Sequence, residues 1–312
     1  MKTNLIVILL LLPLMDYAQQ LTDNNYRIYS VKQQKEVPLS AIITDMENYD
    51  VLIYGEQHND SVTHYLEKTI FEMMYAQYNS NLALSMEMFD RDVQPVMNEY
   101  LAGYIREKHF KKDARVWSNY SDYRAMVEFS KEKNLPVICA NAASRYTNLA
   151  GRKGIAELMK LPKESKANFA PLPYDTATGD YHNKLWELSG HSITPVTQIS
   201  DTLKVQTPPP MMMGNFNLVV AQSLWDATMA FSIAEFKKKN PEKKIFHING
   251  RFHSDEGFAV VMQLKKYSPK TKPLIISSTS DDSFPNIDWS PFKKLGDYII
   301  ITDPKVPVTY EE

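Results

Sequence analysis

Cysteine is almost absent from this sequence, since Cys139 is the only one among 312 residues. A single cysteine cannot form an internal disulfide. The apolar stretch LPVICA around Cys139 predicts a small, buried hydrophobic side chain. The folded state must therefore be stabilised by its hydrophobic core. Residues for a large core are available, because the chain contains 18 tyrosines, 13 phenylalanines, 15 methionines and 4 tryptophans.

An excess of basic charge is also missing. The 35 lysine and arginine residues are balanced by 37 aspartate and glutamate residues, and the formal net charge is −2 with an isoelectric point near 6.4. Proteins that bind nucleic acid or anionic membranes carry a basic surface. The composition therefore predicts neither kind of partner.

Long apolar runs are lacking, apart from one near the N-terminus. Leu5–Leu14 is apolar and follows Lys2, which is the layout of a secretory signal peptide and is too short for a comfortable membrane span. We expect cleavage near Ala18, although Asp16 is not the small residue usual three positions before a cut; an uncleaved anchor is the alternative. No cysteine lies near this cut, which excludes a lipid attached there. The sequence predicts an exported protein of the periplasm or cell envelope.

Six short apolar runs predict buried strands, because they are rich in β-branched residues and nearly continuous rather than alternating. They are Val51–Tyr54, Leu82–Met86, Pro136–Ala140, Lys244–Ile248, Leu274–Ser277 and Tyr298–Thr302. Helical periodicity follows Asp60, an expected N-cap, and recurs across residues 215–238. This alternation predicts an α/β fold with a mainly parallel sheet flanked by helices.

Two segments interrupt the alternation. Residues 91–133 show helical signals only, and residues 147–214 are long for a connection. We assign both to a smaller helical subdomain within a single domain of residues 19–312, which follows the signal peptide of residues 1–18. The α/β core then comprises residues 26–90, 134–146 and 215–303.

Ionisable side chains follow three of the predicted strands directly. The first strand is followed by GEQH at 55–58, and the fourth by GRFH at 250–253. The second strand carries Glu87 at its end. In an open parallel sheet, sites form outside the carboxyl ends of the strands, and a glycine there lets the backbone approach a neighbour or a ligand closely. We therefore expect four side chains to meet at one rim: Glu56, His58, Glu87 and His253.

This set of residue types supports two kinds of chemistry. Imidazole and carboxylate groups together can bind a divalent transition metal. A histidine and a glutamate with separated pKa values can instead act as acid and base. A structural interpretation is the third, with each histidine capping a helix or hydrogen-bonded to the sheet. One Gly-x-x-His motif is weak evidence, but two copies after apolar strands favour a shared site.

The order and content of these motifs resemble one known family, the ChaN-like proteins. The similar stretches are GEQHND at 55–60, LSMEMFDRDVQP at 84–95, the spacing Trp117–Tyr120–Tyr123, LPVICANAASR at 135–145, AQSLWDATMA at 221–230 and NGRFHSDEGF at 249–258. ChaN-like proteins are haem-binding, iron-regulated uptake proteins, related more distantly to the Tiki, TraB and erythromycin-esterase-type group. The resemblance extends from about Asp50 to Lys266.

The resemblance implies an α/β core with a helical subdomain, and haem carried by dimers. It also implies a tyrosine that can ligate the iron and a histidine that helps to hold the propionates. In Tiki-like relatives the matching elements form a hydrolytic or metal site, which corresponds here to Glu56, His58, Glu87 and His253. This sequence lacks the lipid-attachment cysteine of many ChaN-like proteins. It also has Phe258-Ala259 after Gly257, where the family has a proline.

Haem requires an apolar slot, axial ligands and groups that hold its propionates. Tyr174, Tyr181 and His182 are candidates, because they fall in the predicted insertion, where a lid over a cofactor can lie. Arg145 offers a planar fork of donors for a propionate, with a surface salt bridge as the alternative. The methionines at 211–213 can ligate haem iron through a thioether, although such a run is more typical of a docking patch or a packed loop.

Several residues on predicted helices have simpler expected environments. Asp226 lies beside the apolar stripe of its helix and is free to face the rim or the solvent. We expect His64 and His109 to be solvated. Three aromatic residues are expected to pack in the core: Trp117, Tyr120 and Tyr123.

Two functions follow from these observations. The favoured one is an exported protein that binds haem or a similar iron porphyrin for haem or iron uptake. Its partners would be haem, an outer-membrane or periplasmic uptake protein, and a second copy in a haem-linked homodimer. The alternative is a metal-dependent hydrolase, a peptidase or esterase, that uses the four rim residues. A rim that only braces the loops is the third interpretation.

Overall fold

The structure is a computed structural model, and it describes residues 21–188, 212–213 and 216–311. The predicted signal peptide, the segment 189–211 of the predicted insertion, and Met211 of the methionine triplet lie outside the described residues. Within the described part of the chain, no helix is both long enough and apolar enough to cross a membrane.

One mixed sheet runs through the molecule. Its strands are β1 (Tyr26–Ser30), β2 (Lys35–Glu36), β3 (Val51–Glu56), β4 (Leu82–Asp90), β5 (Val137–Asn141), β8 (Lys244–Gly250), β9 (Pro273–Ser280) and β10 (Tyr298–Thr302). They are arranged in the order β2-β1-β10-β9-β3-β8-β4-β5. The six strands from β10 to β5 are parallel, and β1 and β2 add an antiparallel edge. The predicted α/β class and the six predicted strands are confirmed, whereas β1 and β2 have no counterpart among the predicted strands.

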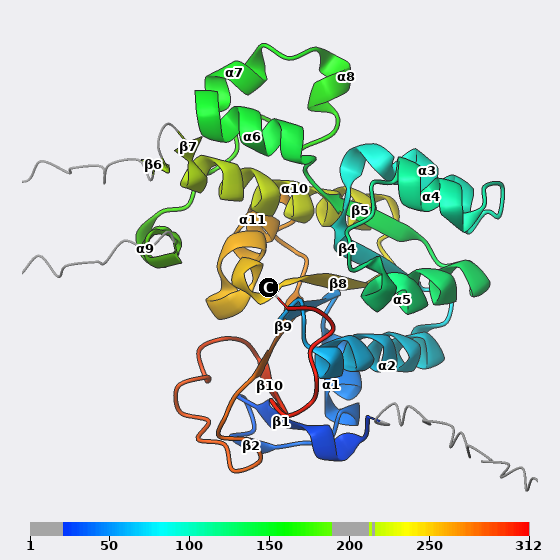
Figure 1. Ribbon diagram of the computed structural model, residues 1–312, viewed down its shortest axis with the longest axis vertical. Helices are drawn as coiled ribbons and strands as arrows, with labels where there is room; N and C mark the ends of the chain where they lie inside the picture. The colour runs from blue at the N-terminus through cyan, green and yellow to red at the C-terminus, as the bar shows by residue number, and fades with distance from the viewer. Residues whose placement is uncertain (1–20, 189–211, 214–215, 312) are drawn as a thin grey trace, which may run out of the picture.

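Eleven α-helices lie in the described residues (Figure 1). They are α1 (Ser40–Asp45), α2 (Ser61–Tyr78), α3 (Gln94–Leu101), α4 (Glu107–Asp113), α5 (Tyr120–Glu132), α6 (Ser144–Lys153), α7 (Ile155–Met159), α8 (Lys163–Lys166), α9 (Gly179–Leu188), α10 (Leu218–Lys239) and α11 (Ala259–Tyr267). A short two-stranded sheet of β6 (Met212–Met213) and β7 (Phe216–Asn217) precedes α10. Two 3-10 turns, η4 (Arg251–His253) and η5 (Asp255–Gly257), follow β8.

Helices cover both faces of the sheet, which explains why its central strands are largely apolar and buried on both sides. Leu52 and Tyr54 of β3 belong to a core shared with α1, α2, α3 and α5. Val51 and Ile53, which point to the other face, pack with α10 and α11. Figure 1 shows α6, α7 and α8 lying farther out, beyond α10. The free thiol of Cys139 is buried in the first of these cores, as expected.

Asp60 fixes the start of α2 immediately after the first strand-end turn. Its Oδ1 accepts hydrogen bonds from the backbone N–H groups of Val62 and Thr63, at 2.8 and 3.2 Å. Its Oδ2 accepts a hydrogen bond from Thr302 at the end of β10. The expected N-cap is thus confirmed, and the same carboxylate also ties α2 to the sheet.

The C-terminal segment returns across this corner of the molecule. The backbone N–H of Thr309 donates to the carbonyl of Asn59 at 2.9 Å, and its hydroxyl donates to Asp122 at 3.0 Å. The hydroxyl of Ser61 donates to the carbonyl of Pro307. The chain after β10 therefore lies over the start of α2 and helps to enclose the residues beneath.

Replacing Asp60 by alanine is expected to destabilise the fold. The change removes the cap of α2, an effect of about 1–2 kcal/mol, and leaves the buried Thr302 hydroxyl without its acceptor. The measurement is urea unfolding followed by circular dichroism. The matched control is Asp60→Asn, which keeps a capping oxygen and should lose clearly less stability; equal losses in the two variants would contradict the capping role.

Candidate functional site

Two Gly-x-x-His turns pack directly against each other at the carboxyl ends of β3 and β8. These strands are adjacent and parallel, and Glu56 is paired with Gly250. A Cβ added to Gly55 would lie 2.7 Å from Ser254 Oγ and 2.9 Å from the Cα of Arg251. A Cβ added to Gly250 would lie 2.6 Å from Nε2 of His58. Both glycines are therefore required by close approach between the two turns.

The first turn forms a group of side chains around the carboxyl of Glu56. Its Oε1 lies 2.6 Å from Nδ1 of His58 and accepts a hydrogen bond of 2.6 Å from the Tyr123 hydroxyl of α5. Burial by itself raises the pKa of Glu56, but hydrogen bonds with Glu67 and His58 lower it to about 2. Burial by itself lowers the pKa of His58, but its bond to Glu56 raises it above the ordinary value. The pair is therefore an ionised carboxylate with an imidazole that favours its protonated form.

The second turn forms a similar group around His253. Its Nδ1 lies 2.6 Å from Oδ1 of Asp226 on α10, and its Nε2 lies 3.5 Å from Oε1 of Glu87 at the end of β4. Burial by itself lowers the pKa of His253, but the charge of Glu87 and the bond to Asp226 raise it to about 9. Asp226 also accepts a hydrogen bond of 2.6 Å from the Tyr181 hydroxyl.

Glu87 connects the two groups. Its Oε2 accepts a hydrogen bond of 2.7 Å from the backbone N–H of Gly250, the glycine against which His58 packs. Its charge also raises the pKa values of both His58 and His253. The structure thus brings the four predicted rim residues together at neighbouring strand ends, with each histidine paired to a carboxylate through Nδ1.

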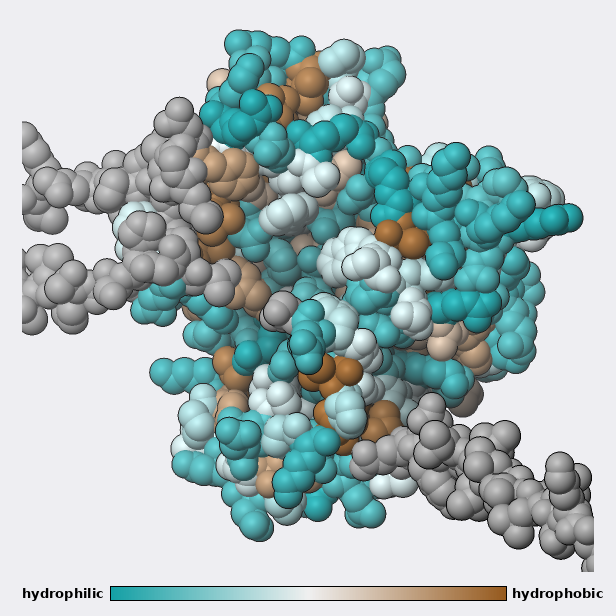
Figure 2. Space-filling view, viewed as in Figure 1, coloured by the Kyte–Doolittle hydropathy of each residue, from teal (hydrophilic) through white to brown (hydrophobic). Residues whose placement is uncertain are grey.

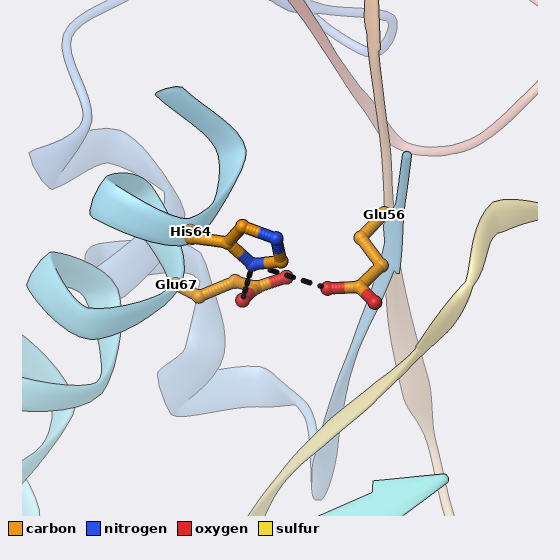
Figure 3. A group of neighbouring side chains, drawn as sticks. All are labelled: Glu56, His64 and Glu67. Carbon is orange, nitrogen blue, oxygen red and sulfur yellow. Dashed lines mark hydrogen bonds and ion pairs between the residues drawn. The ribbon is translucent and has the colours of Figure 1, made fainter. Parts of the chain in front are cut away.

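A further group of buried side chains lies beneath the first turn (Figure 3). His64 and Glu67 project from α2 toward Glu56, as Figure 3 shows. His64 Nδ1 is 3.1 Å from Oε2 of Glu67 and 3.7 Å from Oε2 of Glu56. Burial, together with the charge of Glu56, raises the pKa of Glu67 well above its usual value. Glu56 is therefore the ionised carboxyl of this pair and Glu67 the protonated one.

The expectation that His64 is solvated is wrong. His64 is buried, and its ring packs edge to face on Tyr123 at 5.1 Å. The residues at positions 64, 67, 71 and 74 form one face of α2, and all are buried. On this face the polar residues His64 and Glu67 come first, and the apolar residues Phe71 and Met74 follow. Polarity alone therefore predicts that the first part of the face is exposed to solvent. His109, by contrast, is exposed on α4 as expected.

The two tyrosines considered for haem are engaged in internal hydrogen bonds. Tyr181 is buried, donates to Asp226, and has a pKa raised well above its usual value by burial and by the charge of Asp226. Tyr174 is also buried, and its hydroxyl donates to the carbonyl of Val220 at 2.8 Å. Each of the two hydroxyls is therefore already bonded to an internal acceptor.

The other two candidates have different surroundings. Arg145 forms an ion pair of 2.5 Å with Asp92 and lies over the ring of Tyr146, which is the salt bridge considered as its alternative role. His182 is half-buried on α9, and its ring stacks on that of Trp186 with centroids 6.3 Å apart. Trp186 itself packs against a small cluster with Phe252 and Phe258 beside the second turn.

Sequence reasoning missed three residues of the site and left one open. The sequence does not predict Glu67 or Tyr123 as part of the site. Helical periodicity indicates the face on which a residue lies but not the ionisable group that it contacts. His64 and Glu67 are three residues apart and share a face with Phe71, so counting that phenylalanine would have indicated burial. Asp226 was expected to face the rim or the solvent, and it faces the rim, where it is buried against His253.

Replacing Gly250 by alanine is expected to displace His58. The new methyl group would overlap the imidazole, and overpacking of this kind destabilises by about 1–3 kcal/mol. Urea unfolding of Gly250→Ala, His58→Ala and the double variant forms a cycle. We expect Gly250→Ala to cost less stability in the His58→Ala background, because the imidazole that the methyl group would overlap is then absent. Strictly additive losses would contradict direct contact between the two turns.

The His253 pair predicts a dependence of stability on pH. Because the folded pKa of about 9 lies above the reference value of 6.5, the unfolded chain binds fewer protons between these values. The contribution of protonated His253 to the free energy of unfolding is therefore complete below pH 6.5 and is lost as the pH rises through about 9. In Asp226→Asn the decline should be smaller, whereas the exposed control Asp282→Asn should follow the wild type. Unfolding free energies measured from pH 6 to 10 test this, and identical profiles in all three proteins would contradict it.

The family model "Haem-binding uptake, Tiki superfamily, ChaN" matches residues 42–264. The fold is similar to a solved structure described as cofacial heme binding to ChaN of Campylobacter jejuni, with 16% sequence identity, a TM-score of 0.63, and coverage of 90% of this chain and 98% of that chain. The type III effector HopBA1 is less similar, with 9% identity, a TM-score of 0.42, and coverage of 85% and 93%. No curated protein matches the sequence.

The matched segment includes both Gly-x-x-His turns and every residue that they bring together at the rim. It also covers well over half of the 312 residues. This chain therefore belongs to the ChaN family of haem-binding uptake proteins in the Tiki superfamily.

Proposed function

We propose that this protein is exported, binds haem, and takes part in haem or iron uptake. The observation that carries the proposal is the family match over residues 42–264. Export is proposed from Lys2 and the apolar run Leu5–Leu14, which have the layout of a signal peptide. Haem itself is proposed as the ligand, with an uptake protein of the outer membrane or periplasm as the partner.

The rim supports the proposal through its charge. Both rim histidines are paired with carboxylates that favour their protonated forms. His58 is the more accessible, with 31% of its side chain exposed. A protonated imidazole can donate a hydrogen bond to an anion but cannot ligate a metal through the protonated nitrogen. We therefore assign His58 to a haem propionate, because its partly exposed imidazole can donate a hydrogen bond to an anion.

An apolar surface next to the rim supplies a place for the porphyrin plane. Trp186, Phe252 and Phe258 are only partly buried and pack around Tyr181. Figure 2 shows hydrophobic residues reaching the surface near the N-terminal part of α10, on the side where Figure 1 places α9. Rings and apolar side chains of this kind are what a haem plane packs against. We call these three side chains the aromatic platform.

His182 is the residue that we propose as an axial ligand. Its ring stacks on Trp186 of the aromatic platform, and imidazole is a common ligand of haem iron. Tyr174 and Tyr181 are less suitable, because their hydroxyls are buried and bonded to other groups. Lys184 lies over Phe252 at 5.5 Å and forms an ion pair of 3.1 Å with Glu256 at the edge of the platform.

A haemin titration of residues 19–312 tests the proposal. Saturable binding with a defined Soret band is expected. His182→Ala should weaken binding about tenfold or more, which corresponds to about 1.4 kcal/mol, and should change the ligand-field bands. His109→Ala, an exposed histidine on α4, is the matched control and should behave as the wild type.

The outcomes separate the function from the ligand assignment. If the wild type takes up haemin only non-specifically, haem binding is rejected. If binding is saturable but His182→Ala leaves affinity and spectrum unchanged, His182 is rejected as the ligand while the function stands. Light scattering on the same samples tests the proposed haem-linked homodimer, which requires the mass to double when haem is added.

A further inference from the structure

The group formed by Glu56, His64 and Glu67 has the properties of a ligand site that is separate from the rim. The three side chains come from the end of β3 and from one turn of α2, and each is buried. One donor atom from each lies within 4.8 Å of the other two. None of the haem-binding residues proposed above belongs to this group, so the inference does not depend on the proposed function.

The hydrogen bonds of His64 determine which of its nitrogens faces the carboxyl groups. Nε2 lies 2.9 Å from the backbone carbonyl of His58 and 3.7 Å from Oδ2 of Asp122. A carbonyl oxygen can only accept, so Nε2 must carry the proton in the neutral ring. The lone pair is then on Nδ1, which points toward Glu56 and Glu67.

The carboxyl oxygens on the other side lack protein donors. Glu56 Oε2 and Glu67 Oε1 are both fully buried, and neither has a hydrogen-bond partner among the described residues. Buried carboxylates require a partner, since leaving such a group unpaired is strongly unfavourable. Two carboxyl groups and an imidazole lone pair that converge in this way require either a proton, held by Glu67, or a cation between them.

We propose that this group binds a divalent first-row transition-metal ion through His64 Nδ1 and the carboxylates of Glu56 and Glu67. Ligand atoms about 2.1 Å from a tetrahedral ion are about 3.4 Å apart, and the observed separations from Nδ1 are 3.1 and 3.7 Å. The ion takes the place of the proton shared by the two carboxyls. One imidazole with two carboxylates suits zinc, iron(II) or manganese, whereas magnesium and calcium prefer oxygen ligands alone.

The surrounding contacts are those expected around such ligands. Metal-bound histidines usually donate their second N–H to a carbonyl or carboxylate, as His64 does through Nε2. Bound carboxylates are usually hydrogen-bonded as well, and Glu56 Oε1 is held by Tyr123 and His58. The ion would therefore connect β3 to α2 directly beneath the exposed ring of His58.

Cobalt(II) and element analysis provide the test on residues 19–312. After dialysis against zinc or manganese, the wild type should retain about one ion per chain, and cobalt(II) should give visible d–d bands. Glu67→Gln should lower the affinity for cobalt(II) about tenfold or more, because loss of a residue that only hydrogen-bonds to a metal ligand already costs about tenfold. The matched control, Glu72→Gln, changes a half-exposed glutamate on the same helix that pairs with Lys68, and it should bind cobalt(II) as the wild type does.

Each outcome is decisive. No retained ion in the wild type would mean that a shared proton alone joins the carboxyls, and the proposal would be overturned. Unchanged cobalt(II) binding in Glu67→Gln would place the ion elsewhere and would also overturn it. If Glu67→Gln does not fold, anomalous diffraction from wild-type crystals decides, because the peak must lie between His64, Glu56 and Glu67. Haemin binding is measured separately, so its failure is distinguishable from failure of the metal site.

Discussion

The carboxyl group of Glu56 is the point on which the architecture of the site depends. It is buried at the end of β3, where burial alone would make its charge unfavourable, and it remains ionised because hydrogen bonds reach it from several elements. Tyr123 of α5 and His58 of the first turn hold one oxygen. His64 and Glu67 of α2 face the other. One charge in the interior thus fixes how a strand, a turn and two helices meet.

The contact between the two glycine-containing turns extends this constraint across the rim. Without side chains at Gly55 and Gly250, β3 and β8 approach until the ring of His58 rests on the backbone of the second turn. Glu87 then bonds to that backbone and interacts with His253. The two histidine–carboxylate pairs therefore form one electrostatic unit, in which the carboxylates raise the pKa values of both rings.

The depth of each group separates the roles that we propose for them. His58 is partly exposed, and its bond to Glu56 raises its pKa, which suits contact with an anionic ligand such as a propionate. His64 lies beneath it, with a lone pair directed at two carboxyls, which suits a metal ion. The aromatic platform is formed by α9, the second turn and the N-cap residue of α11. A single edge of the sheet thereby offers polar, buried and apolar environments.

The sequence by itself determined the class of fold, because short continuous apolar runs between helical patterns occur where a parallel sheet is covered on both faces. It also placed Glu56, His58, Glu87 and His253 at one rim, since parallel strands end on the same side. Periodicity did not reveal that His64 and Glu67 are buried, nor that Asp226 and Tyr123 pair with rim residues. The pairs Asp226–His253 and Tyr123–Glu56 join residues that are distant in the chain. Only the tertiary structure decided them, because pairing in the interior depends on which helix packs over which strand end.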